Sequence, residues 1–126
     1  MDDASLIAEF EATTLADLSH RDHVRLVFLY ARTGDAVARI RDGLIAYTAA
    51  RGSASHFHET RTWAWGTLIA TAADGFDGDF DAFWARHPEF DRRYLLSDYY
   101  SDAVLESDEA RAFIVQPDLK PLVPLA

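Results

Sequence analysis

Apolar residues recur every three or four positions through most of this chain, and that spacing is the strongest constraint on its fold. Between residues 3 and 12, for example, Leu6, Ile7 and Phe10 keep the spacing. It matches one face of an α-helix, whereas a half-buried strand alternates polar and apolar residues. The pattern therefore predicts a chain built from helices, and no segment carries the pattern of a strand.

Cap residues and a glycine mark where the predicted helices begin and end. Ser19 can accept a hydrogen bond from an unpaired amide of a first helical turn, and Asp35 is placed to cap the next helix. Gly34 follows a helix end, and a residue before proline, as in His87-Pro88, is pushed away from helical geometry. The expected helices are residues 3–12, 20–32, 36–51, 58–74 and 80–86.

Helical signals are weaker in the C-terminal third, where residues 90–100 and 107–115 are predicted to be helical. Beyond them, prolines force an extended tail. We expect its apolar side chains to pack on the body; these are Leu119, Leu122, Val123 and Leu125. The whole sequence predicts an all-α fold, a compact bundle of five to six helices with an extended, proline-rich C-terminal tail, forming a single domain over residues 1–126.

The composition excludes several classes of protein. With 126 residues the chain has room for one hydrophobic core. It contains no cysteine, which rules out disulfides, thiolate metal sites and cysteine nucleophiles. A net charge of −9 makes nucleic acid an unfavourable partner, and no apolar stretch approaches the roughly 20 residues that span a bilayer. The acidic start Met1-Asp2-Asp3 is unlike a secretory signal, so we expect a soluble, cytoplasmic protein.

Four of the five histidines form two close pairs, His20 with His23 and His56 with His58. Histidine is the commonest protein metal ligand and changes protonation near neutral pH. On a helical wheel, His20 and His23 continue the apolar stripe of the second helix, and His58 heads the stripe of the fourth. The histidines are therefore predicted to face the core near the N-terminal ends of two helices.

Connectivity brings these two helix ends together. Short loops join the second, third and fourth helices, so the second and fourth should run in the same direction. Their first turns should then place His20, His23 and His58 in a shared pocket. Three imidazoles with an open position are the pattern of a catalytic divalent metal site, and zinc, iron, manganese, nickel or copper would suit them. Glu59 is the candidate fourth ligand or general base, and His56 is an alternative fourth ligand.

The main hypothesis is a metal-binding protein and, if it is an enzyme, one whose metal acts on a small polar molecule. A second hypothesis needs no metal: the histidines and Glu59 do acid–base work on a small molecule in a pocket roofed by aromatic side chains. A third is a helical interaction module, such as a homodimer, in which the histidines are incidental. Arg61 is predicted to form a surface ion pair, with Asp22 as one candidate partner, or to bind a carboxylate.

Three segments resemble a family of small, uncharacterised bacterial proteins. The segments are residues 18–26 (LSHRDHVRL), 58–64 (HETRTWA) and 117–122 (PDLKPL). The family carries F-x-H-x-x-H followed by H-E-T-x-T-x-A, and Leu18 stands here in place of the aromatic residue. The resemblance implies a helical fold and points to His20, His23, His58 and Glu59, without implying an activity. A looser similarity is to the DinB-like metal-binding helical bundles, whose histidines are spaced H-x-x-x-H instead.

Overall fold

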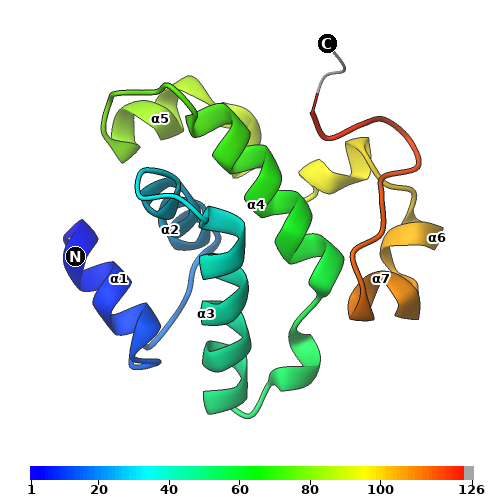
Figure 1. Cartoon of the computed structure of the whole chain (residues 1–126), viewed down its shortest axis with the longest axis horizontal. Helices are drawn as coiled ribbons and strands as arrows, with labels where there is room; N and C mark the ends of the chain where they lie inside the picture. The colour runs from blue at the N-terminus through cyan, green and yellow to red at the C-terminus, as the bar shows by residue number, and fades with distance from the viewer. Residues whose placement is uncertain (124–126) are drawn as a thin grey trace.

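The computed structural model describes residues 1–123, and every regular element in that part of the chain is helical (Figure 1). The all-α prediction is confirmed. The described residues form seven α-helices rather than five to six, because the C-terminal third adds two short ones. The α-helices are α1 (Asp3–Glu11), α2 (His20–Ala31), α3 (Ala36–Ala50), α4 (Glu59–Ala73), α5 (Phe80–Arg86), α6 (Asp102–Leu105) and α7 (Asp108–Ala112). The 3-10 helices are η1 (Ala54–His56), η2 (Pro88–Asp91) and η3 (Leu95–Asp98).

Helix α4 lies at the centre of the arrangement. On one side it packs against α2 and α3, and on the other it contacts α7 and η3 (Figure 1). A helix covered on two sides buries more than one stripe. The side chains of Thr60 and Ala64 are therefore buried in addition to those of Trp65 and Ile69. Among residues 1–123, no helix has both the length and the apolar character needed to cross a membrane.

Side-chain caps fix several helix starts, and Ser19 is the predicted example. Its Oγ accepts a hydrogen bond from the amide of Asp22 at 3.0 Å, which confirms the predicted start of α2. Helix α3 begins where expected, but within the described residues the Asp35 side chain makes no cap hydrogen bond. Gly34 and Asp35 instead form the turn with positive φ angles of 89° and 59°. Both conformations are left-handed, which glycine adopts at no steric cost and aspartate tolerates.

Residues 90–100 do not form the predicted single helix. After η2 the backbone of Arg92 turns extended, with φ −79° and ψ 105°, and η3 follows as a separate turn. Helix α7 also ends earlier than predicted, at Ala112. There Phe113 is extended and its carbonyl accepts a hydrogen bond from Thr60 Oγ1 at 2.6 Å. Tertiary contact with α4 thus overrides the local helical preference.

The C-terminal tail packs on the body only in part. Leu122 is buried as predicted, whereas Leu119 and Val123 are exposed. The segment is held through its backbone instead, since the amide of Leu119 donates to the carbonyl of Tyr99 at 2.9 Å. Pro124 and Leu125, which also belong to the predicted tail, lie outside the described residues.

Thr60 holds the start of this tail on α4 with one hydroxyl group. It is fully buried, donates to the carbonyl of Phe113 and accepts from the amide of Val115 at 3.0 Å. Thr60→Val preserves the shape but leaves both backbone groups without their partner, so we expect the free energy of unfolding to fall by about 2 to 3 kcal/mol. Urea unfolding measures the loss. Thr60→Ser keeps the hydroxyl and is the control; an equal loss in both variants would assign the effect to packing instead.

Helix α1 approaches α3 closely at Gly43, where a Cβ atom would lie 2.3 Å from the ring of the fully buried Phe10. Gly43→Ala should therefore destabilise the protein by about 1 to 3 kcal/mol, although alanine favours a helix over glycine by about 1 kcal/mol. Denaturant unfolding tests this. Phe10→Leu should lower the free energy of unfolding less in the Gly43→Ala background than in the wild type, because the smaller side chain relieves the clash. A more stable Gly43→Ala variant would contradict the close packing.

Candidate functional site: a histidine-lined pocket

The starts of α2 and α4 lie together, and a pocket of about 180 Å³ opens between them and η1. Histidines from all three segments line it: His23 from α2, His56 from η1 and His58, the N-cap residue of α4. We call it the histidine pocket; its lining also includes Arg61, Thr62 and Trp65. Two of the three histidines predicted to share a pocket, His23 and His58, therefore do so.

His20, the third predicted ligand, does not line the histidine pocket. Its Nε2 lies 2.6 Å from the carbonyl oxygen of Phe90, so this nitrogen donates to the backbone of η2. Its ring also packs edge-on against Trp65, with the ring centroids 5.1 Å apart. His20 thus ties the first turn of α2 to both η2 and α4.

Both ring nitrogens of His58 are occupied by the backbone. Nδ1 accepts a hydrogen bond from the amide of Arg61 at 3.1 Å, and Nε2 donates to the carbonyl of Leu105 at 2.9 Å. This pairing fixes the neutral tautomer with the proton on Nε2. Burial lowers the pKa of His58, which also favours the neutral ring. His58 caps α4 and attaches α6 to it, and neither nitrogen has a lone pair left for a metal or a ligand.

His23 is in the opposite situation. It is half-buried, and no hydrogen bond joins its ring to any other part of residues 1–123. Burial, with a smaller contribution from nearby His20, lowers the pKa of His23 to about 4. At neutral pH the ring is therefore uncharged, and one of its nitrogens carries a lone pair at the wall of the pocket.

Glu59 is engaged outside the histidine pocket. Its Oε1 lies 2.5 Å from Nε of Arg41, and its Oε2 lies 3.4 Å from Nη2 of the same side chain. The pair joins the first turn of α4 to α3, and the Glu59 side chain is only 15% exposed. In this structure the residue proposed as general base is thus a fixed, paired carboxylate that binds two helices together.

The histidine set does not fit a metal ion in this arrangement. Within residues 1–123, no group of three or more histidine, aspartate or glutamate side chains is placed to hold one. The reason lies in the hydrogen bonds: His58 has no free nitrogen and His20 is turned to the carbonyl of Phe90. Metal binding through His20, His23 and His58 remains a prediction from the sequence.

A larger cavity, of about 630 Å³, lies next to the histidine pocket and shares two lining residues with it, Arg61 and Trp65. We call it the arginine cavity. Its wall brings together α4, the segment before η3 and α6, through Arg61, Trp65, Arg93, Tyr94, Asp102 and Glu106. The predicted surface ion pair of Arg61 exists, but its partner is Glu106 and not Asp22. The polar residues Arg93, Asp102 and Glu106 follow no local pattern that distinguishes them from solvent-facing positions, so the sequence does not predict this cavity.

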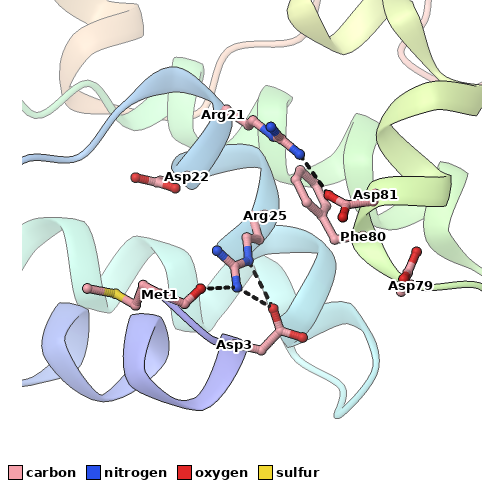
Figure 2. A pocket seen from close by; sticks show the side chains of 8 residues that line it. All are labelled: Met1, Asp3, Arg21, Asp22, Arg25, Asp79, Phe80 and Asp81. Atoms are coloured by element: carbon pink, nitrogen blue, oxygen red, sulfur yellow. Dashed lines mark hydrogen bonds and ion pairs between the residues drawn. The ribbon is translucent and has the colours of Figure 1, made fainter.

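A third cavity, of about 390 Å³, lies where α1, α2 and α5 meet (Figure 2). Its two arginines are already paired with carboxylates: Arg25 Nη2 lies 2.6 Å from Asp3 Oδ1, and Arg21 Nη2 lies 2.8 Å from Asp81 Oδ1. These pairs hold α1 and α5 against α2 (Figure 2). Because both arginines of this cavity are already paired with carboxylates of the fold, we assign the cavity a structural role.

No family model, curated protein or solved structure matches this chain. The resemblance to the bacterial family with the F-x-H-x-x-H motif therefore stays a prediction, and the function has to be argued from the pockets.

The low pKa of His23 makes stability depend on pH. The folded-state pKa of about 4 lies below the ordinary value of 6.5, so the unfolded chain binds the proton more readily. The contribution of His23 to the free energy of unfolding is fully present above about pH 6.5. It is lost as the pH drops toward 4, by on the order of 1 to 3 kcal/mol. His23→Gln should flatten the profile of unfolding free energy between these pH values. The exposed His56, changed to Gln, is the control; a wild-type profile in His23→Gln would contradict the assignment.

Proposed function

We propose that the protein binds a small organic molecule in the histidine pocket and that His23 accepts a hydrogen bond from it. The observation that carries the proposal is the half-buried, uncharged and unpartnered ring of His23 at the pocket wall. A ring nitrogen that makes no hydrogen bond within the fold has a lone pair free for a partner in the pocket. A ligand carrying an N–H or O–H group would supply the missing partner.

The rest of the pocket supports a ligand with an apolar body. Trp65 contributes an aromatic wall, and His20 packed edge-on against its ring holds that wall in place. Thr62 adds a hydroxyl group to the same lining. Ligand sites in proteins are lined mainly by apolar and aromatic side chains, with a few polar groups that set orientation. His23 and Thr62 are those groups here.

A histidine of such low pKa accepts hydrogen bonds well but is a weak proton acceptor at neutral pH, since a general base works best with a pKa near the working pH. The pocket by itself therefore supports ligand binding rather than acid–base catalysis. It becomes suited to acid–base chemistry when a bound group of negative charge raises the pKa of His23.

A divalent metal ion is the second candidate, favoured by the fact that His23, His56 and His58 line one pocket. His58 would have to release the carbonyl of Leu105 or the amide of Arg61 to act as a ligand. Metal binding should therefore loosen α6 or the first turn of α4, which a binding event at His23 alone would not do.

Three small donors, namely phenol, indole and pyrazole, test the first candidate in ¹H–¹⁵N NMR titrations of the histidine and tryptophan side chains. We expect at least one of them to shift the His23 and Trp65 signals to saturation. His23→Gln should weaken that binding about tenfold, because the loss of one hydrogen bond costs about 1.4 kcal/mol of binding free energy. His87→Gln changes a histidine that does not line the pocket and should leave the binding unchanged. Absence of saturable shifts with all three probes, or full affinity in His23→Gln, would overturn the proposal.

Titration with Zn²⁺ or Ni²⁺ in the same NMR experiment separates the second candidate from the first. A metal site should shift His23 and His58 together, raise the melting temperature and vanish on adding chelator. Donor binding that persists unchanged in chelator, with no metal-dependent shift of His58, would reject the metal and leave the organic ligand.

A further inference from the structure

The histidine pocket is too small to be the whole of a ligand site. Its volume is about 180 Å³, below the range of about 300 to 1,000 Å³ that is usual for ligand pockets. The arginine cavity next to it, at about 630 Å³, lies inside that range. Because Arg61 and Trp65 line both spaces, these two side chains form a shared wall, and a ligand lying along them would contact both spaces.

The arginine cavity contains two guanidinium groups with hydrogen-bonding capacity to spare. The Nε atom of Arg61 is buried and has no hydrogen-bond partner within residues 1–123. A buried N–H left without a partner costs about 1 to 3 kcal/mol. Arg93 lines the same cavity and is exposed, and it makes no ion pair with any carboxylate of the described residues.

Two acidic residues, Asp102 and Glu106, line the arginine cavity, and the one paired with Arg61 leaves room for an anionic ligand. Glu106 is paired with Arg61, but its side chain is 60% exposed and that of Arg61 is 43% exposed. Exposed ion pairs contribute about 0 to 1 kcal/mol, so a ligand carboxylate can take the place of Glu106 at little cost. Arg93 carries no such competitor among residues 1–123, which makes it the primary anion-binding group.

Aromatic side chains indicate what the anion is attached to. Trp65 is almost fully buried, at 8% exposed, and lines both spaces, while Tyr94 is 83% exposed and lines the arginine cavity. Tyrosine and tryptophan present large, rigid surfaces that pack against flat rings. A planar ring beside Trp65 would lie at the junction between the two spaces.

We propose that the ligand is a small aromatic carboxylate that spans both spaces. Its carboxylate binds Arg93 and Arg61, its ring packs on Trp65, and a donor group at its other end reaches His23. This assignment rests on the proposed function, because it names the class of molecule that the histidine pocket takes. Arginine recognises carboxylate oxygens through two parallel hydrogen bonds, which makes a carboxylate the best-matched anion.

The test compares 4-hydroxybenzoate, which has both a carboxylate and an O–H donor, with phenol, which has the donor alone. We expect 4-hydroxybenzoate to bind at least tenfold more tightly than phenol, as measured by NMR titration and tryptophan fluorescence. Arg93→Gln should reduce this advantage to less than about threefold and leave phenol affinity unchanged. The advantage should also shrink as salt is raised, because exposed charges are screened.

The matched control is Arg92→Gln. Arg92 neighbours Arg93 in the chain but is paired with Asp98 at 2.9 Å and does not line the arginine cavity. Arg92→Gln should therefore retain the full preference for 4-hydroxybenzoate. An equal loss in Arg92→Gln and Arg93→Gln would show a general effect of surface charge and overturn the carboxylate site.

The remaining outcomes separate this inference from the proposed function. If no donor probe binds, both are wrong. If phenol binds through His23 but 4-hydroxybenzoate gains nothing, only the carboxylate site is wrong. Inorganic phosphate is the last probe: if it displaces 4-hydroxybenzoate more effectively than benzoate does, the cavity takes a tetrahedral anion, and the carboxylate assignment is overturned.

Discussion

The rest of this structure depends on two hydrogen bonds made by the imidazole of His58. One ring caps the first turn of α4 through Nδ1 and holds the carbonyl of Leu105, at the end of α6, through Nε2. It therefore attaches the C-terminal helices to the helix that packs against α2 and α3. Leu105 and Glu106 line the arginine cavity, so the wall of that cavity is set by the same two hydrogen bonds.

The histidines at this end of the bundle differ in role because they differ in available partners. His58 and His20 are each held by a backbone carbonyl, from Leu105 and Phe90 respectively. His23 is half-buried without such a partner, and its burial lowers its pKa to about 4. Two histidines thus act as structural connections, while the ring of the third makes no hydrogen bond to residues 1–123 and lines the histidine pocket. All three are histidines near a helix start, and their long-range partners set them apart.

The same distinction between local patterns and long-range partners explains which features could be predicted from the sequence. Apolar spacing and the Ser19 cap predicted α2 through local rules, and the shared direction of α2 and α4 followed from short connections. The bonds of His58 to Leu105 and of Thr60 to Phe113 join residues 47 and 53 positions apart. No local pattern encodes such partners, so the early end of α7 and the occupied nitrogens of His58 were not predictable. The ion pair of Glu59 was not predictable for the same reason, since its partner Arg41 belongs to another helix.

The buried polar groups of the fold are otherwise well paired. Tyr30 donates to Glu11 at 2.7 Å, Tyr47 to the carbonyl of Leu15 at 3.1 Å and Tyr100 to the carbonyl of Val115 at 2.7 Å. Among the described residues, Nε of Arg61 is the buried side-chain polar atom without a partner, and the His23 ring, which also makes no hydrogen bond to residues 1–123, lines the histidine pocket together with Arg61 and Trp65. Folding tolerates such exceptions where another partner supplies the missing bonds. Because Trp65 and Arg61 line both spaces and His23 lines one of them, the ligand proposed above would lie close to all three side chains.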